Sequence, residues 1–393
     1  MEKLYCGLDA IYEEMVEVRR YLHQYPELSF QETNTAAYIA DYHAQLGHKV
    51  RRHVGGNGVV AYLQGAKPGP TVALRADFDA LPIQEEADVP FKSKHDGVMH
   101  ACGHDGHTAT LLGLAKVLNG MKEELAGTVV FLHQHAEELP PGGAIAMIED
   151  GCLEGVDVIF GTHLQAQQPL GVISYRSGAL QAAADNFDIM IQGSGGHGAA
   201  PHETKDSIAI GAQLINSLQH IVSRKVDPLD SAVVSVCNFV AENPYNVIAN
   251  TAQLTGTVRT LKEETRKFIE EEIERTIKAT CDMFQAGYEY TYSQGYPVLV
   301  NHPKETAFVA QVAKQVPGIE QVSETLPIMG GEDYAYYLQH VKGTFFFTGA
   351  GNPDWDKAYP HHHPKFDMDE LALLHAAKVL GAATLQYMRR DER

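Results

Sequence analysis

Cysteine and histidine gather in one short segment in a manner typical of a metal site. The nine residues Met99–His107, MHACGHDGH, contain three His, one Cys and one Asp. Thiolate and imidazole groups bind transition metals such as zinc, and Cys102 and His104, separated only by Gly103, can converge on one centre. A lone histidine is more often a buried core residue than a ligand, but three ligand types in one glycine-containing segment favour metal binding.

Further candidate ligands lie in three other segments of the chain. Glu137 and Glu138 follow the apolar run at residues 128–132, and paired carboxylates can divide labour, one binding metal and the other acting as general base. His163 follows a second apolar run, and His361–His363 form a three-histidine run in which spacing alone selects no ligand. Because these donors outnumber the ligands of one tetrahedral zinc ion, two metal ions are favoured over one.

The hydrophobic periodicity predicts the elements that must position these residues. Strands alternate with helices up to residue 160, which indicates a largely parallel, doubly wound α/β sheet. Ligands bind beyond the carboxyl ends of the strands in such a sheet, and the candidate ligands follow its strands. The expected helices cover residues 8–24, 33–46, 107–118 and 143–150, and the expected strands cover residues 49–54, 59–63, 71–76, 128–132 and 156–160.

A second domain is predicted where the pattern changes, near residue 180. Residues 185–297 predict the order β-α-β-β-α-β of a ferredoxin-like domain, with strands at 186–192, 232–240, 247–260 and 289–294 and helices at 205–224 and 263–284. After it, helices at 306–316, 333–339 and 370–387 and a strand at 344–348 resume the first pattern. We therefore expect one α/β domain in two parts, residues 1–182 and 297–393, interrupted by an α+β domain at residues 183–296.

The composition disfavours several classes of protein. A content of 44% hydrophobic and 21% charged residues is typical of a globular protein, and a net charge of −19 disfavours nucleic acid and anionic membranes as partners. Five cysteines, odd in number and widely spaced, argue against a disulfide framework and for a reducing compartment. The N-terminal residues lack the apolar stretch of a signal peptide, and no apolar run approaches ~18 residues. We therefore expect a cytoplasmic protein.

Several motifs, in order along the chain, resemble those of the M20 metallopeptidase family. The resemblance covers residues 19–370 and is closest to the amidohydrolase branch, which includes N-acyl-amino-acid hydrolases, hippurate hydrolases, aminoacylases and plant auxin-conjugate hydrolases. It implies a zinc-peptidase-like α/β catalytic domain with an inserted ferredoxin-like satellite domain, and a homodimer or higher homo-oligomer formed through the satellite domain. The motifs are RRYLHQYPELSFQET, LRADFDALPI, MHACGHDGHTATLLGLAKVL, HAEELPPGGA, GTHL, GSGGHGAAPH, NVIANTAQLTGTVRT, MGGEDYAYY and HHHPKFDMDE.

The resemblance implies a centre of two divalent ions, which would be zinc, manganese, cobalt or nickel. Cys102 matches the ligand that bridges the two ions in this branch, where other M20 enzymes use Asp. The other matched ligands are His104, Glu138, His163 and His362, the last because the family has a His two residues before Pro. A metal-bound water with its pKa lowered to about 7 would be the nucleophile.

The resemblance also implies roles in catalysis and substrate binding. Glu137 matches the general base, and Asp79 matches a carboxylate that supports the metal centre. His197 matches a residue that polarises the substrate carbonyl, often from the partner subunit. The matched groups around the substrate carboxylate are Asn246, Arg259 and Gly331. An arginine suits this role because its planar fork can bind a carboxylate through two hydrogen bonds.

The chain departs from the family pattern at three places. Asp77 stands where other M20 branches have a metal-binding His, and His135 replaces Pro in the usual Gln-Pro-Ala before the glutamate pair. His361–His363 replace the usual Leu-His-Ser before Pro364. The extra imidazoles could compete for metal or lie beside it, so the choice among the three C-terminal histidines stays open.

These observations predict a metal-dependent hydrolase of N-acyl-L-amino acids that releases a carboxylic acid and a free amino acid. A metallo-exopeptidase, either a carboxypeptidase or a dipeptidase, is the alternative on the same scaffold. Cys102 and Asp77 favour the N-acyl-amino-acid hydrolase over this alternative. A non-catalytic binding protein would be expected to lack Glu137 or a ligand, and the sequence retains them. A cysteine hydrolase built on Cys102 is disfavoured because so many candidate ligands surround that thiol.

Overall fold

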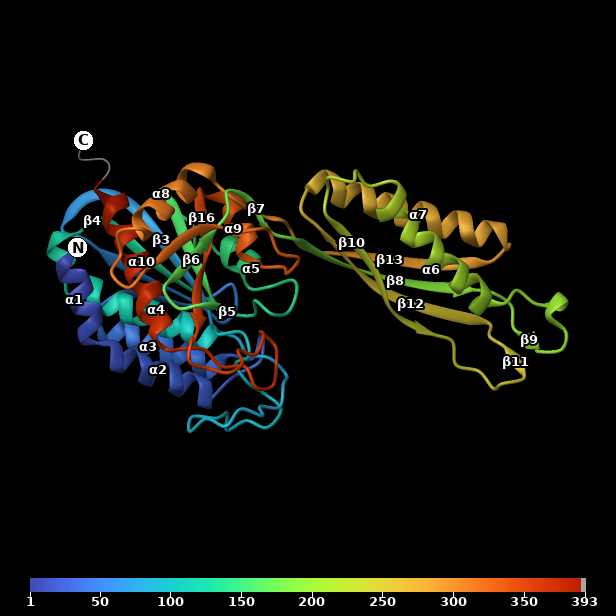
Figure 1. Cartoon of the computed structure of the whole chain (residues 1–393), viewed down its shortest axis with the longest axis horizontal. Helices are drawn as coiled ribbons and strands as arrows, with labels where there is room; N and C mark the ends of the chain where they lie inside the picture. The colour runs from blue at the N-terminus through green and yellow to red at the C-terminus, as the bar shows by residue number, and fades with distance from the viewer. Residues whose placement is uncertain (390–393) are drawn as a thin grey trace. The chain divides into compact units, whose positions relative to one another are not determined.

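The computed structural model describes residues 1–389, and Figure 1 shows the path of the chain. The described chain divides into two compact units. The first contains Met1–Gly178, Val300–Leu326 and the chain from Asp333 onward, and the second contains Ala179–Leu299 with Pro327–Glu332. The predicted mixed α/β fold is confirmed, although Pro327–Glu332 groups with the second unit rather than the first. Within residues 1–389, no helix is long and apolar enough to cross a membrane.

The first unit is built on an eight-stranded sheet whose strands are β1 (Lys49–Val54), β2 (Gly58–Gln64), β3 (Lys67–Asp77), β4 (Ala126–Gln134), β5 (Val158–Pro169), β6 (Val172–Tyr175), β15 (Gln321–Glu324) and β16 (Gly343–Gly351). Their order is β1-β2-β4-β3-β5-β16-β6-β15. The four central strands are parallel to one another, as predicted. The strands β1, β2 and β6 each run antiparallel to a neighbour, so the sheet is mixed towards its edges.

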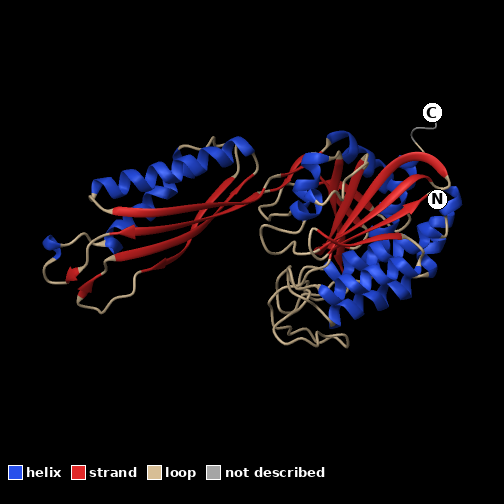
Figure 2. Cartoon of the chain, turned by 180° about the vertical axis from the view of Figure 1, so that it is seen from behind, coloured by secondary structure: helices blue, strands red, loops and turns tan. Residues whose placement is uncertain are grey.

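Helices cover both faces of this sheet (Figure 2). They are α1 (Glu2–Ala10), α2 (Tyr12–Gln24), α3 (Thr33–Gln45), α4 (His104–Asn119), α5 (Ala144–Glu149), α8 (Pro303–Ala313), α9 (Tyr334–His340) and α10 (Leu371–Met388). On β5, the Phe160 ring packs against Phe308 of α8 and Tyr387 of α10, whereas the next residue, Gly161, contacts Tyr334 of α9. Because successive residues of a strand point to opposite faces, α9 lies on the opposite face from α8 and α10.

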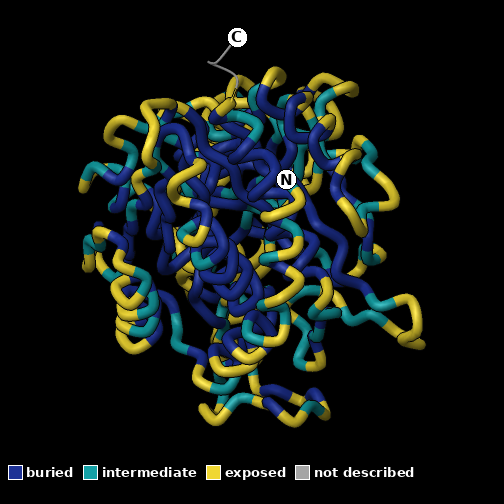
Figure 3. Tube along the Cα trace, turned by 90° about the vertical axis from the view of Figure 1, so that its left-hand side faces the viewer, coloured by how far each residue is buried: buried dark blue, intermediate teal, exposed yellow. Residues whose placement is uncertain are grey.

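Helix α4 passes through the interior of the first unit and begins at His104. Nearly all of its residues are buried, and Figure 3 shows how the buried residues gather in the interior. Gly103, directly before the helix, has a φ of 93°, a conformation that favours glycine. Gly113 lets α2 approach closely, because a Cβ there would lie 2.6 Å from Met15 Cγ.

The N-terminal helix differs from the prediction of one helix over residues 8–24. The structure contains α1 and α2, which are separated at Ile11, and the first begins at Glu2. Leu4 and Leu8 are fully buried, and Leu4 packs beside Gly381 of α10. The chain therefore becomes helical earlier than its local periodicity predicts, because tertiary contacts bury the first turns.

A buried ion network joins α2, α4 and the start of α10. Arg19 of α2 is 0% exposed, and its Nε lies 2.8 Å from Asp105 Oδ2 of α4. Its two terminal nitrogens lie 3.2 Å from Asp367 Oδ1 and 3.2 Å from Glu370 Oε1, just before α10. Because a buried guanidinium is stable only when its charge is paired, these carboxylates fix α2, α4 and the start of α10 relative to one another.

The second unit contains an antiparallel sheet in the order β10-β12-β8-β13, formed by β8 (Ala183–Gln192), β10 (Ala232–Val240), β12 (Thr251–Thr260) and β13 (Gly287–Tyr296). Two amphipathic helices, α6 (Ser207–Arg224) and α7 (Glu263–Met283), bury their apolar residues with those of the sheet in one core. The chain order is the predicted β-α-β-β-α-β. The short strands β7 (Gly178–Gln181) and β14 (Leu299–Asn301) lie near the ends of the inserted segment.

One strand expected in the second unit is divided. Residues 247–260 form β11 (Val247–Ile248) and then β12 rather than a single strand. The first piece leaves the main sheet to pair with β9 (Gly196–His197), and Val247 lies opposite His197.

Three histidines of the first unit form a buried hydrogen-bonded chain. His43 of α3 lies at its centre, with Nδ1 2.9 Å from His48 Nδ1 and Nε2 2.9 Å from His133 Nε2 on β4. Burial lowers the pKa of His43 to about 2 and the pKa of His133 to about 3, and it also lowers the pKa of His48. All three rings are therefore neutral in the folded chain at neutral pH.

We expect this histidine chain to make the fold sensitive to acid. Histidine in an unfolded chain titrates near pH ~6.5, so below that pH the unfolded chain binds protons that the folded chain excludes. The free energy of unfolding should therefore fall as the pH falls, by up to about 1.4 kcal/mol per pH unit for each excluded proton. Urea unfolding between about pH 7 and about pH 5 measures this slope. His133→Gln should reduce the slope of unfolding free energy against pH, whereas His340→Gln, at an exposed histidine, should not. Equal slopes for the wild type and both variants would contradict the prediction.

Candidate active site

The candidate ligands meet at one edge of the eight-stranded sheet. The strands β3, β4 and β5 are parallel, so their carboxyl ends open onto the same edge. Asp77 is the last residue of β3, Glu137 follows β4, and His163 lies in β5. Cys102 and His104 reach this edge from the start of α4.

One cluster consists of Cys102, His104 and Glu138, whose ligand atoms all lie within 4.8 Å of one another. His104 Nδ1 donates to the carbonyl oxygen of Asp79 at 3.0 Å and lies 3.1 Å from its Oδ1. The lone pair of the neutral ring therefore lies on Nε2, which is buried and has no hydrogen-bond partner among residues 1–389. This atom lies 3.8 Å from Glu138 Oε1, so both can reach one ion.

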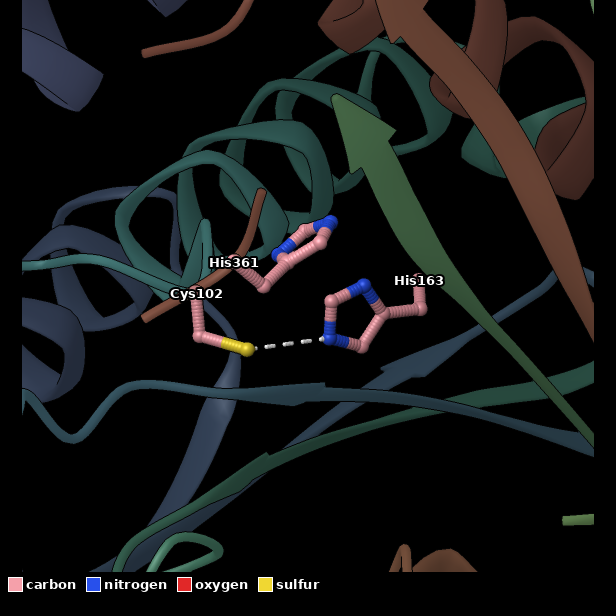
Figure 4. Close-up of side chains that lie close together, drawn as sticks. All are labelled: Cys102, His163 and His361. Atoms are coloured by element: carbon pink, nitrogen blue, oxygen red, sulfur yellow. Dashed lines mark hydrogen bonds between the residues drawn. The ribbon is translucent and has the colours of Figure 1, made fainter. Parts of the chain in front are cut away.

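A second cluster consists of Cys102, His163 and His361, and Figure 4 shows the three side chains converging. Cys102 Sγ lies 3.4 Å from His163 Nε2. His163 Nδ1 donates to the Leu164 carbonyl at 2.8 Å, which leaves the lone pair on Nε2, facing the sulfur. His361 packs against His163 with ring centroids 5.1 Å apart, and its Nε2 accepts a hydrogen bond from the Ala166 N–H at 3.3 Å.

Cys102 belongs to both clusters, so its sulfur lies where one atom could bridge two metal ions. Burial raises the pKa of the Cys102 thiol well above its usual range, and the carboxylates of Glu138 and Glu137 raise it further. A cysteine nucleophile needs a lowered pKa, whereas a coordinating metal ion deprotonates a thiol outright. The surroundings of Cys102 therefore disfavour a cysteine hydrolase and fit a metal ligand.

Carboxylates give the first cluster a strong preference for a cation. Although burial lowers the pKa of His104, Asp77 and Asp79 raise it to about 10, with a contribution from Glu138. The carboxylate of Glu137 also lies 3.9 Å from His104 Nε2. Sulfur, imidazole and carboxylate donors around this surplus negative charge are the set that divalent transition metals prefer.

Two buried carboxylates orient the residues that carry these donors. Asp79 Oδ2 accepts hydrogen bonds from the Glu138 N–H at 2.9 Å and the Ser29 hydroxyl at 2.7 Å. Glu32 Oε1 accepts from the Ala136 N–H at 2.8 Å, and Ala136 has a φ of 53°. The backbone around the glutamate pair is thus held from both sides. The sequence indicated no role for Glu32, because its partner lies 104 residues away.

The three C-terminal histidines take different positions. His361 lies in the second cluster, and His362 Nε2 lies 3.3 Å from Glu138 Oε1, beside the first cluster. The His363 ring stacks on Tyr359, and its Nδ1 accepts a hydrogen bond from the Lys365 N–H. Two histidines therefore approach the clusters where the resemblance selected only His362.

The other predicted site residues lie in the second unit. His197 is exposed and sits in β9, and the Gly198 N–H donates to the Asn246 carbonyl at 2.8 Å, so the two motifs adjoin. Arg259 of β12 is half-buried and donates to the carbonyl oxygens of Asp185 and Val258. A Cβ on Gly331 would lie 3.0 Å from Ala184 Cβ, so a small residue suits this position.

Residues 73–386 match the model of Peptidase family M20/M25/M40. This chain belongs to that family. The Bacillus subtilis protein YhaA, which is named as an amidohydrolase, is 61% identical to this chain over 97% of this chain and 96% of its own length. The N-acyl-L-amino acid amidohydrolase of Geobacillus stearothermophilus is 47% identical over 75% of this chain and 80% of its own. The predicted M20 resemblance is confirmed, and the chain is a hydrolase that acts on amide bonds.

Two further relatives are named as peptidases. Thermostable carboxypeptidase 1 of Saccharolobus solfataricus is 41% identical over 94% of this chain and 94% of its own length. A solved structure from Bacillus subtilis, described as a dinuclear metal binding peptidase from the M20 family, is 35% identical with a TM-score of 0.84, over 97% of this chain and 99% of that one.

Proposed function

We propose that this M20 hydrolase is a cytoplasmic enzyme that cleaves the amide bond of N-acyl-L-amino acids, releasing a carboxylic acid and a free amino acid. The proposal rests chiefly on the Cys102 sulfur, which two ligand clusters share, and on Glu137, whose carboxylate lies 3.9 Å from His104 Nε2 of the first cluster. Similarity to the Geobacillus enzyme supports the choice of substrate class.

The proposed cofactor is a pair of divalent metal ions per subunit, either zinc, manganese, cobalt or nickel. The two clusters around Cys102 and the dinuclear relative support the pair. Cys102 would bridge the ions, and the other proposed ligands are His104, Glu138, His163 and His362. When bound, such ions polarise the scissile carbonyl and lower the pKa of a water molecule.

The chain's own residues would supply the proton transfers and the orientation. Glu137 would take the proton of the attacking water on its carboxylate and pass it to the nitrogen of the leaving amine. Asp79 would keep the His104 ring in the tautomer that presents Nε2, since it already accepts the Nδ1 proton.

Residues of the second unit would recognise the substrate. Arg259 would bind the free carboxylate, with Gly331 near the same end of the sheet. His197 and Asn246 lie beyond the other end of β12, so they would reach the substrate of a partner subunit, where Asn246 would approach the carboxylate and His197 would donate to the oxyanion that develops on the carbonyl. We also propose a homodimer, or a higher homo-oligomer, formed through the second unit.

A substrate panel tests the proposal. Metal-free protein, reloaded separately with each of the four ions, should hydrolyse N-acetyl and N-benzoyl amino acids faster than dipeptides. Faster cleavage of dipeptides or of C-terminal residues would instead support the metallo-exopeptidase, which the similarity to a carboxypeptidase makes the second candidate. Binding without turnover for every ion and substrate would overturn both.

Arg259→Ala should weaken substrate binding more than turnover. Loss of a charge-assisted pair costs about 1.5–3 kcal/mol, so KM should rise by about 10- to 100-fold with a smaller change in kcat. The preference for free acids over their methyl esters should also disappear. Arg259→Lys, which keeps the charge without the planar fork, should have a KM between those of the wild type and Arg259→Ala. Arg224→Ala, at an exposed arginine, is the control and should leave KM unchanged. Unchanged discrimination between acid and ester would remove Arg259 from the site.

His197→Ala should lower kcat by about 10²–10³, the effect of removing one oxyanion donor. If His197 acts across a dimer, mixing inactive His197→Ala subunits with inactive Glu137→Gln subunits should restore part of the activity, because one mixed site keeps both groups. Co-purification of the two variants, each carrying a different affinity tag, must first establish that mixed dimers form. No recovery in proven mixed dimers would assign each site to a single subunit.

A further inference from the structure

His107 is a buried histidine whose two ring nitrogens are both engaged. It lies in the first turn of α4, is 4% exposed, and has Nδ1 2.5 Å from Asp77 Oδ1. Its Nε2 accepts a hydrogen bond from the Leu164 N–H at 2.9 Å. Because Nε2 must therefore hold the lone pair, Nδ1 carries the proton and donates it to Asp77. His107 lies near Asp77 and His104, but its lone pair is already used by a backbone donor.

The partners of His107 connect it to both candidate clusters. Leu164 directly follows His163 on β5, and the His107 ring packs edge-on against the His163 ring with centroids 4.6 Å apart. On its own helix, His107 lies one turn after His104 and packs against its ring at 5.4 Å. The His107 ring thus contacts one ligand of each cluster, His104 of the first and His163 of the second.

Asp77 anchors this side chain to the sheet. Its Oδ2 accepts from Arg75 Nη1 at 2.5 Å, and its main-chain carbonyl accepts from the Thr108 hydroxyl at 2.8 Å. Asp77 and Arg75 are both buried at the end of β3. The chain Arg75–Asp77–His107–Leu164 therefore links β3, α4 and β5 through hydrogen bonds of defined direction.

We propose that His107 is a positioning residue of the metal centre: it holds the backbone that follows His163, so that His163 and His104 face the same Cys102 sulfur, and it binds no metal itself. This inference rests on the proposed two-metal function. It also gives Asp77 a task, that of orienting His107, in a branch where this position is not a metal-binding His.

Two substitutions separate the two hydrogen bonds of the ring. In His107→Gln, the side-chain carbonyl can reach the place of Nε2 and accept from the Leu164 N–H. In His107→Asn, the shorter amide can replace Nδ1 towards Asp77 but cannot reach Leu164. His107→Phe removes both bonds, and His375→Gln, at a buried histidine of α10, controls for general loss of stability.

Cobalt(II) titration of the metal-free, full-length proteins is the test, read by the visible absorption of the bound ion and by competition with a chromophoric chelator. We expect His107→Asn and His107→Phe to lose about 10- to 100-fold in affinity for at least one cobalt ion, the usual effect of removing a ligand's supporting partner. Their cobalt spectra should change, while His107→Gln should stay near the wild type in both respects and His375→Gln should match it.

Two results would overturn the inference. If His107→Asn keeps the cobalt affinity and spectrum of the wild type, the hydrogen bond from the Leu164 N–H is dispensable. If His107→Gln and His107→Asn lose cobalt affinity equally, that hydrogen bond does not position the ligands. A wild-type chain that binds no cobalt would instead overturn the proposed metal-dependent function itself, which keeps the two failures distinct.

Discussion

Cys102→Ala should lose most of its bound metal and lower kcat/KM by about 10³-fold or more, because metal ions contribute several kcal/mol of transition-state stabilisation. The sulfur is the one atom that both ligand clusters share. Without the sulfur, the first cluster keeps His104 and Glu138, and the second keeps His163 and His361. Two ligands are too few for a closed metal site. Elemental analysis of the purified protein and turnover of an N-acetyl amino acid measure the two effects.

Matched variants make this result specific. Cys152→Ala removes a buried thiol that lies outside both clusters and should keep metal and activity. Cys102→Asp supplies an oxygen bridge of the kind that other M20 enzymes use, so it should retain more metal than Cys102→Ala. Two bound ions and full turnover in Cys102→Ala would remove the bridging sulfur from the account.

Glu137→Gln should lower kcat by about 10²–10⁴, the usual range for loss of a general base, while both metal ions stay bound. The amide is nearly the same size but cannot accept the proton of the attacking water. Its neighbour provides the contrast: Glu138→Gln should weaken metal binding, because Glu138 Oε1 lies 3.8 Å from His104 Nε2 and 3.3 Å from His362 Nε2.

Metal content and kcat, measured on both glutamate variants under the same metal loading, distinguish their roles. Raising the metal concentration should restore activity to Glu138→Gln but not to Glu137→Gln. If both variants lose metal equally and recover equally, the proposed division between base and ligand is wrong.

Most of the fold could be predicted because its signals are local. The hydrophobic pattern predicted the central elements of both units, and β1 and β10 have the bounds that the sequence predicted. It did not predict the short strands β6 and β15 of the eight-stranded sheet. The break at Ile11 could not be predicted, since it depends on α1 packing against α10 while α2 packs against α4. The departure of β11 from the main sheet likewise depends on its pairing with β9.

The site could be predicted in its residue types but not in its geometry. Cysteine, histidine and paired glutamates after strand ends indicated a metal centre, and the structure brings Cys102, His104, Glu138 and His163 together. Spacing could not separate His361 from His362, because adjacent side chains leave the backbone in different directions. The hydrogen bonds of His107 join residues 30 and 57 positions apart in the chain, so no local pattern indicates them.

The buried guanidinium of Arg19 has a consequence for how the chain is made. Two of its carboxylate partners, Asp367 and Glu370, lie 348 and 351 residues later in the sequence, so they leave the ribosome long after Arg19. Until then α2 cannot bury this charge with its full set of partners, so its docking must wait for the segment that directly precedes α10. Completion of the first unit must therefore await the synthesis of residues 367–370, whereas the second unit, which is continuous apart from residues 327–332, can form its own core earlier.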